Sequence, residues 1–123
     1  MLDETIVAGQ IIGAVADGVG GTMLSELLYD EQAQLLTGSL ADYLVTSAAE
    51  APRVRLDHVS TLPTTNPLRV RGVGEGGIIA VAPAIINALR RAISPSSAEA
   101  EQALFHIPLK PERVLGVIRG AGP

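Results

Sequence analysis

A single glutamate lies among four glycines in the sequence GVGEGG, residues 72–77. The pattern G-x-G-x-x-G follows the alternating run LRVR and precedes an apolar stretch, where a dinucleotide-binding loop could lie. A carboxylate at Glu75 would repel the pyrophosphate that such a loop holds at a helix N-terminus. The polar segment SPSSAEAEQ then stands where a second strand is required. A dinucleotide-binding domain is therefore disfavoured.

Glu75 has two other interpretations. An exposed carboxylate near the start of a helix complements the helix dipole and contributes roughly 0.3–1 kcal/mol. The flanking glycines favour the second interpretation, because residues without side chains let a bulky partner approach the backbone and meet one carboxylate. The pattern thus predicts an acid with a chemical role on a closely approached loop.

The two histidines are weaker candidates, and we expect both to be structural. In a strand, Asp57 and His58 would point to opposite faces, so Asp57, His58 and Ser60 would not form a catalytic triad. His106 has no carboxylate or second histidine near it in sequence. The chain has no HExxH motif and no cysteine, so we expect no metal bound directly by its side chains and no iron–sulfur cluster.

Composition narrows the class of protein. The 123 residues carry a net charge of −4 without a basic run, which disfavours nucleic-acid binding. Only 2% of residues are aromatic, so the core must be built from small aliphatic side chains, as suits part of a larger body. The acidic start MLDETIVAG is unlike a signal peptide. The longest apolar runs are shorter than the roughly 20 residues of a membrane span, so we expect a cytoplasmic chain.

The expected fold class is α+β, with a glycine-rich helix, short strands and then helices. Helical spacing covers residues 3–28, and five interior glycines each cost about 0.5–1 kcal/mol, which predicts close approach of a backbone or ligand. The apolar stripe of this helix is Ile12, Val15, Val19, Met23 and Leu27.

Short strands are expected within residues 29–38, 53–59 and 68–71, with a loop at 61–67. A helix is expected over 77–93, with Pro83 near its start or kinking it. Ser96 and Glu99 have capping-box spacing for a further helix, and Pro111 suits the first turn of a last one.

The glycine-rich helix and the glycine-bracketed glutamate together give a resemblance to a known family. The chain resembles the C-terminal end of the molybdenum-binding subunit of the xanthine dehydrogenase, aldehyde oxidase and aerobic carbon monoxide dehydrogenase family. The matching segments are GQIIGAVADGVG at 9–20, ELLYDEQAQLLTGSLADY at 26–43, NPLRVRGVGEGG at 66–77, APAIINAL at 82–89 and IPLKPERV at 107–114.

The resemblance implies that residues 1–123 form the C-terminal part of a molybdopterin-binding domain. It implies that Glu75 is the general base, which takes a proton from the oxygen that attacks an electron-poor carbon of the substrate. Gln10 would contact the pterin or the metal ligands through its amide. The backbone of Gly72, Val73 and Gly74 would pass close to the metal. Two departures are Asp17, where many relatives have glutamine, and Arg69, at a position that is often glycine.

The resemblance also implies partners. The cofactor would be shared with the remainder of the molybdenum subunit, and iron–sulfur and FAD groups would lie on other chains. The chain would be part of a molybdopterin-dependent oxidoreductase and inactive alone, acting on an aldehyde, heterocycle or related substrate. The alternative is a non-catalytic remnant or assembly module of the same fold.

Overall fold

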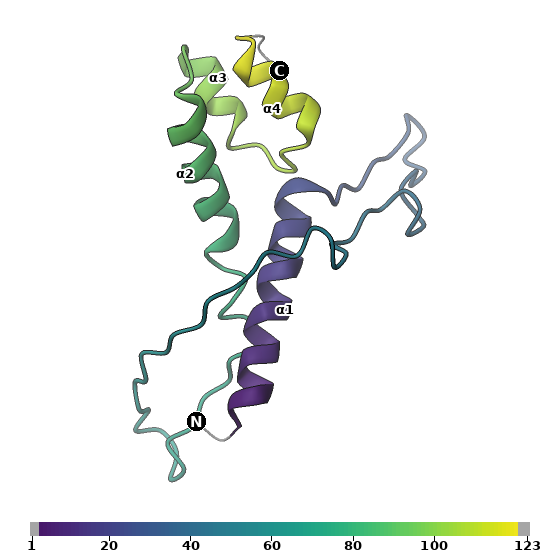
Figure 1. The fold of residues 1–123 in the computed structure, drawn as a ribbon. Coiled ribbons are helices and arrows are strands. Elements are labelled where there is room, and N and C mark those ends of the chain that lie inside the picture. Colours follow the sequence, from purple (N-terminus) through teal and green to yellow (C-terminus); the bar gives the residue numbers. More distant parts are fainter. Residues whose placement is uncertain (1–2, 121–123) are drawn as a thin grey trace.

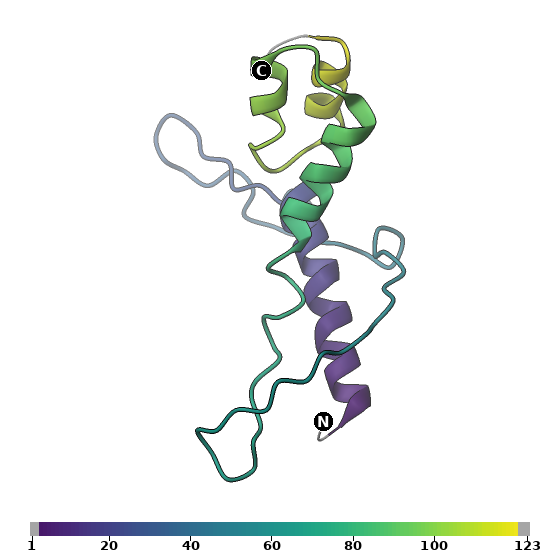
Figure 2. The same ribbon diagram turned by 90° about the vertical axis from the view of Figure 1, so that its left-hand side faces the viewer.

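The computed structural model describes residues 3–120, which form an elongated arrangement of four helices joined by long irregular segments (Figure 1). The helices are α1 (Glu4–Met23), α2 (Val81–Ile93), α3 (Ala98–Ala103) and α4 (Pro111–Ile118). Helices α1 and α2 follow one another along the long direction of the molecule, and α3 and α4 gather beside α2 at one end (Figures 1 and 2). The connection between α1 and α2 returns past the N-terminal half of α1.

Helix α1 has defined ends. The Asp3 side chain caps its start by accepting a hydrogen bond from the N–H of Ile6 at 2.9 Å. At the other end, the carbonyl of Gly20 accepts the N–H groups of both Leu24 and Ser25 at 2.8 Å. The predicted helix over 3–28 therefore ends at Met23, because this paired acceptance closes the last turn.

The packed face of α1 agrees only in part with the predicted apolar stripe, of which Val15, Val19 and Met23 are half-buried. Ile12 and Leu27 of that stripe are exposed, whereas Gly18 and Thr22 are buried. A Cβ at Gly18 would lie 2.8 Å from the Cβ of Val81, so the start of α2 occupies the space that glycine leaves. This part of the packed face was missed because glycine, rather than a large aliphatic side chain, forms the contact.

A second segment crosses α1 on another face. The Thr46 hydroxyl donates to the carbonyl of Ala16 at 2.7 Å, and a Cβ at Gly20 would lie 2.7 Å from that hydroxyl oxygen. Close approach is therefore found at Gly18 and Gly20, but by the side chains of Val81 and Thr46 rather than by the predicted backbone or ligand. By contrast, Gly9, Gly13 and Gly21 have no described atom within 4 Å of the position that a Cβ would take.

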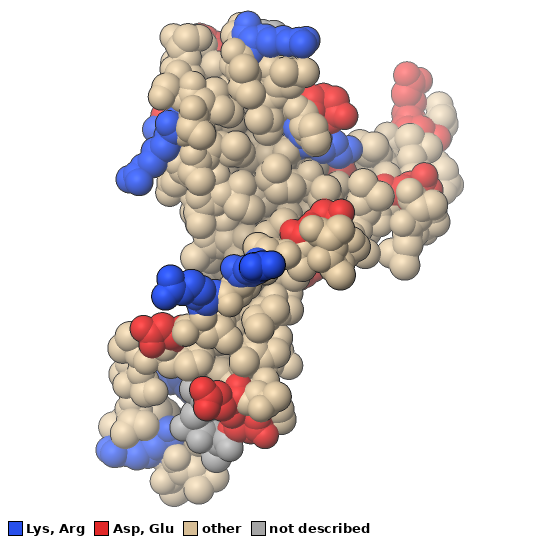
Figure 3. All heavy atoms as spheres, in the orientation of Figure 1, with Lys and Arg blue, Asp and Glu red and all other residues tan. Residues whose placement is uncertain are grey.

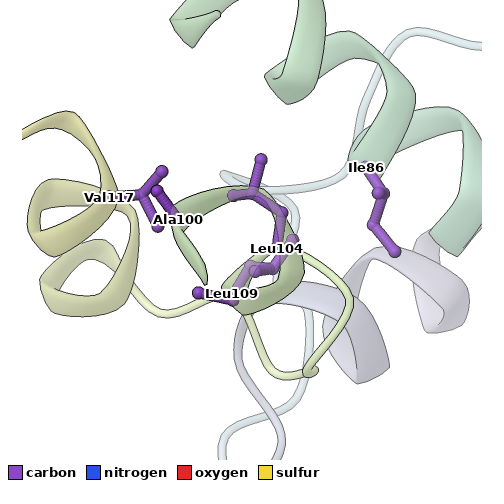
Figure 4. Close-up of a cluster of buried hydrophobic side chains, with 6 residues drawn as sticks. Ile86, Ala100, Leu104, Leu109 and Val117 are labelled. Atoms are coloured by element: carbon purple, nitrogen blue, oxygen red, sulfur yellow. The ribbon is translucent and has the colours of Figure 1, made fainter. Parts of the chain in front are cut away.

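The hydrophobic core is small and lies among the last three helices. Leu104 and Leu109 are fully buried at its centre (Figure 4). The cluster consists of Ile86, Ala100, Ala103, Leu104, Leu109 and Val117, with the half-buried Met23, Leu89, Ile93 and Val114 packed against it. Aliphatic side chains alone build this core, as the scarcity of aromatic residues predicts.

Polar contacts join the end of α1 to this cluster. The buried Thr22 hydroxyl donates to the carbonyl of Gly18 at 2.6 Å, so it is satisfied within the helix. The Thr22 carbonyl accepts the N–H of Leu109 at 2.7 Å. An ion pair between Glu26 and Lys110 reinforces the same junction. The C-terminal half of α1 is thereby held against the residues that precede α4.

The later helices largely follow their sequence signals. Pro111 opens α4 and Pro83 lies in the first turn of α2, as predicted. Helix α2 begins at Val81 rather than at residue 77, because residues 74–80 form consecutive turns. The cap of α3 is Ser97 and not Ser96: its side chain accepts the N–H of Ala100 at 3.1 Å. The predicted cap was therefore one residue too early.

No strand forms within residues 3–120, so the β part of the predicted α+β class is not found in this chain. Residues 29–38 contain only an isolated antiparallel bridge between Tyr29 and Leu35. Residues 53–59 and 68–71 alternate as strands do, but no neighbouring segment supplies the ladder of hydrogen bonds that a strand requires.

The uninterrupted apolar runs in the sequence are shorter than the apolar helix that the structure shows, α1. Its 20 residues are long and apolar enough, by length and composition alone, to cross a membrane. A core helix of a water-soluble protein meets the same criterion. In this chain Val81 and Thr46 contact α1 at Gly18 and Gly20, so part of the helix surface is covered by protein.

The chain exposes more surface than its mass predicts. Its accessible area is 9030 Å², whereas a compact monomer of 12.7 kDa exposes about 6,200 Å². Large apolar side chains contribute to the difference, among them Leu40, Val59, Leu68 and Ile79. The excess of roughly 2,800 Å² is enough to accommodate an extensive protein–protein contact.

We therefore expect the isolated chain to be poorly stable or to self-associate, because its own core covers too little apolar surface. Size-exclusion chromatography with light scattering and thermal unfolding by circular dichroism would measure this. A monomer with a sharp, cooperative transition above about 60 °C would contradict the expectation.

Candidate functional site

The glycine-rich loop forms a series of turns that leads into α2. The N–H of Gly76 bonds to the carbonyl of Val73 at 3.2 Å, and that of Ile78 to the carbonyl of Glu75 at 3.3 Å. The N–H of Val81 then bonds to the carbonyl of Ile78 at 3.1 Å. Because these hydrogen-bonded turns follow one another without a gap, the position of Glu75 is fixed relative to the start of α2.

Gly77 anchors this loop directly on α1. A Cβ at Gly77 would lie 2.7 Å from the carbonyl oxygen of Ile11 and 2.9 Å from the Cβ of Ala14. The first of these atoms belongs to helix backbone, which cannot rotate away as a flexible side chain can. Only glycine fits, and the loop is therefore pressed against the third turn of the helix.

The anchor brings the predicted site residues to the same part of α1. Gln10 directly precedes Ile11, the residue that Gly77 contacts, so Gln10 and the Glu75 loop are neighbours. The side chains of both Gln10 and Glu75 are exposed to solvent. Within residues 3–120 no hydrogen bond joins them, so the arrangement leaves an amide and a carboxylate free to meet a third group.

The rest of the loop is open on one side. A Cβ at Gly72 or Gly74 would meet no atom within 4 Å, and Val73 between them is half-buried. Gly9 and Gly13 on α1 are equally open. Space for the close approach of a large group thus exists along both the loop and the helix.

A tight turn just upstream orients the loop. The Asn66 side chain accepts the N–H of Val70 at 3.1 Å and donates to its carbonyl at 2.9 Å, as a paired strand would. Inside this turn Arg69 has a φ of 53°, in the left-handed region that favours glycine. The arginine at this position is accommodated at a conformational cost.

A groove of about 580 Å³ borders the loop and was not anticipated from the sequence. Gly72 and Val73 of the loop are among the residues that line it. Its lining comes from the cap and first turn of α1 (Asp3, Ile6, Val7), residues 57–62 and residues 69–73. Because these segments are far apart in sequence and carry no common motif, only their spatial arrangement reveals the groove.

The histidines do not add a second site. Asp57 and His58 both line the groove, since the segment is not a regular strand, but Asp57 accepts the backbone N–H of His58 at 2.8 Å. Its carboxylate therefore does not orient the imidazole as a triad requires. No three histidine, aspartate or glutamate side chains of residues 3–120 gather in a way that could hold a metal ion.

Charged side chains of both signs lie on the face of the molecule shown in Figure 3. They stand in small groups among uncharged residues. On this face the basic side chains form no continuous surface.

Comparisons with known proteins show strong similarity over nearly the whole chain. Residues 1–52 match a protein family described as a molybdopterin cofactor-binding domain. The nicotine 6-hydroxylase large subunit of Paenarthrobacter nicotinovorans is 32% identical over 98% of this chain and 14% of its own length. The 6-hydroxypseudooxynicotine dehydrogenase complex subunit gamma of the same organism is 37% identical over 98% of this chain and 15% of its own.

Solved structures agree. Quinoline 2-oxidoreductase from Pseudomonas putida 86 superposes with a TM-score of 0.82 and 31% identity, covering 100% of this chain and 15% of that one. A Cu,Mo-containing carbon monoxide dehydrogenase gives a TM-score of 0.79 at 26% identity, over 93% of this chain and 14% of that one. The chain thus spans about one seventh of the proteins it matches.

Replacing Gly77 by alanine should displace the loop, because the added methyl group would overlap the Ile11 carbonyl. We expect a loss of about 1–3 kcal/mol in the free energy of unfolding. Urea unfolding of the purified complex, followed by circular dichroism, would measure it. Gly21→Ala is the matched control, since its methyl group meets no atom and should stabilise α1 by roughly 0.5–1 kcal/mol. Equal midpoints for the two variants would contradict the anchor.

Proposed function

Because the chain belongs to the family of molybdopterin-binding large subunits found in xanthine dehydrogenase, aldehyde oxidase and carbon monoxide dehydrogenase, we propose that it supplies one wall of a molybdenum site and its catalytic base. The observation that carries the proposal is the seating of Gly77 on α1, which places the Glu75 loop beside Gln10. In this proposal residues 1–123 are the C-terminal part of a molybdopterin-binding domain, and the rest of the large subunit completes it.

Glu75 is the proposed base. Its carboxylate is exposed on a loop whose neighbours Gly72 and Gly74 leave open space, so a reacting group can come within hydrogen-bonding distance. A carboxylate held in this way accepts the proton released as an oxygen nucleophile attacks the substrate. Such a base contributes typically 10²- to 10⁴-fold to the rate.

Gln10 and the glycines are proposed to hold the cofactor. The Gln10 amide can donate and accept hydrogen bonds at once, as a pterin edge requires. The backbone of Gly72, Val73 and Gly74 can lie against the cofactor because no side chain intervenes. When bound, the molybdenum cofactor supplies the redox chemistry, and the residues of this chain position it and move a proton. The open glycine positions and the free amide fit a large group held by hydrogen bonds.

Other cofactors and partners are proposed to lie on other chains. This chain has no cysteine, so it cannot ligate the iron–sulfur clusters that would carry electrons away from molybdenum. Iron–sulfur and FAD-binding subunits are the proposed partners. One relative is named as subunit gamma of a dehydrogenase complex, which supports a multi-subunit assembly. The proposed location is the cytoplasm, with α1 covered by protein.

The proposed substrates are aldehydes, N-heterocycles or related compounds with an electron-poor carbon. Relatives and structural neighbours are named for nicotine, quinoline, aldehydes and carbon monoxide. This range supports the general reaction class of oxidative hydroxylation over any one compound, and nothing in this segment favours the carbon monoxide subtype.

Glu75→Gln should lower turnover by at least about 100-fold while the molybdenum content stays unchanged, because the amide keeps the shape but cannot take the proton. The measurement is reduction of an acceptor dye by the purified complex with an aromatic aldehyde or quinoline. Glu31→Gln, which alters an exposed carboxylate in a distant turn, should leave the rate unchanged. Full activity of the Glu75 variant would refute the assigned role. A wild-type complex that lacks molybdenum and turnover would instead support a non-catalytic assembly module.

Gln10→Ala should weaken retention of the cofactor. Loss of a hydrogen bond from a buried partner costs about 1–3 kcal/mol, equivalent to roughly a 5- to 150-fold loss of affinity. Molybdenum per complex, measured by mass spectrometry after extensive dialysis, should fall, while Gln32→Ala at an exposed turn should leave it unchanged. Equal molybdenum content in the two variants would contradict the proposed role of Gln10 in holding the cofactor.

A further inference from the structure

The chain reverses its direction just before the proposed catalytic loop. Residues 57–62 and residues 69–73 both line the groove, so the residues between them turn the chain back toward α1 (Figure 1). The turn is closed where the carbonyl of Asn66 accepts the N–H of Arg69 at 3.1 Å. Asparagine at the first position and proline at the second, here Pro67, are both favoured in such turns. The reversal is therefore encoded locally in the sequence.

Asn66 takes part in every hydrogen bond that shapes this reversal. Within residues 59–72 of the described chain, each hydrogen bond has Asn66 as one partner. Besides the backbone bond to Arg69, the side-chain oxygen of Asn66 accepts the N–H of Val70, and its side-chain nitrogen donates to the carbonyl of Val70. Both backbone groups of Val70 are thus held by one side chain. One residue therefore sets the direction in which the chain leaves the turn.

The bonds from Asn66 also oppose a backbone preference of Arg69. This arginine has a φ of 53°, although residues with a side chain favour negative φ. Because Asn66 binds both Arg69 and Val70, it holds the backbone on both sides of this angle. Without these bonds, Arg69 would return to negative φ, and the segment after it would leave the turn in another direction.

The direction set at the turn determines how the loop approaches α1. The loop begins beside the first turn of the helix, with which residues 69–73 share the groove, and ends where Gly77 contacts the third turn. The Gly77 contact fixes the place where the loop ends, but not the direction from which it arrives. Glu75 lies between the two points, so its position depends on both.

We propose that Asn66 is a positioning residue for Glu75: its hydrogen bonds fix the direction from which the loop approaches α1, and thereby the place of the carboxylate. Asn66 acts through the turn and touches neither substrate nor cofactor. The proposal rests on the proposed role of Glu75 as the base. It adds a second determinant of where that base lies, besides the contact of Gly77 with the helix.

Hydrogen exchange in the purified complex tests the geometry independently of activity. The amides of Gly76 and Ile78 bond within the loop, so their exchange reports how often the loop opens. In Asn66→Ala both should exchange at least about 10-fold faster than in the wild type. Asn66→Asp keeps an acceptor for the Val70 N–H and should show a smaller increase, which can be measured even if the alanine variant fails to assemble.

Asn87→Ala is the matched control, because Asn87 is an exposed asparagine on α2, outside the loop. It should leave the exchange of both amides unchanged. Wild-type exchange at Gly76 and Ile78 in the Asn66 variants would overturn the proposal.

The kinetics of the loaded complex distinguish positioning from simple destabilisation. Turnover per molybdenum atom should fall about 10- to 100-fold in Asn66→Ala, because misplacement of a reacting group by about 1 Å can cost this much. KM for an aromatic aldehyde should stay close to the wild-type value, since a base acts in the transition state. A merely structural asparagine would instead lower the amount of molybdenum-loaded complex. Unchanged turnover per molybdenum atom would therefore contradict the proposal.

Arg69→Gly supplies a rescue that depends on the turn alone. Glycine adopts positive φ without steric cost, so adding Arg69→Gly to Asn66→Ala should restore most of the turnover and of the protection from exchange. A double variant no better than Asn66→Ala would overturn the proposal, because the turn would then not be the cause of the loss. Wild-type turnover of Glu75→Gln would reject Glu75 as the base, whereas the exchange comparison would still decide whether Asn66 orients the loop.

Discussion

The close approach of Gly77 to the backbone of Ile11 is the contact on which the geometry of the proposed site depends. It leaves no room for a side chain, so it fixes the distance between the loop and α1 to within the size of a methyl group. Glu75 lies two residues before the contact and Gln10 one residue from its other side. Neither residue is held by its own side chain. Their relative position is instead a property of two backbones pressed together.

The two halves of helix α1 lie in different environments. Its C-terminal half is packed by Val81 at Gly18 and bonded through the Thr22 carbonyl to Leu109, so it belongs to the small aliphatic core. Its N-terminal half carries Gly9 and Gly13, which nothing in the described chain approaches. The C-terminal half of the helix is therefore packed, whereas the N-terminal half keeps one face open at Gly9 and Gly13, which agrees with a segment that completes a larger domain.

The sequence predicted the elements that are defined by local signals and missed those defined by distant partners. Pro111 at the start of α4, Pro83 in the first turn of α2 and the turns of GVGEGG follow from short-range stereochemistry. The strands at 53–59 and 68–71 were predicted from alternation, which describes a strand's side chains but not its hydrogen-bonding partner. The part of the packed face of α1 at Gly18 was missed because periodicity counts large apolar residues, and the helix meets Val81 through glycine. The role of Gly77 could be guessed from its residue type, but its contact with Ile11 required the fold.

The junction between Thr22 and Leu109 has a mechanical consequence. Because α1 is one continuous helix from Glu4 to Met23, a twist applied at its anchored end is carried along its axis to Gln10 and to the seat of Gly77. The C-terminal helices are thereby coupled through one helix to the loop that carries Glu75, although they contribute no residue to that loop. The geometry of the proposed site would then depend on the packing of a hydrophobic cluster at the opposite end of the molecule.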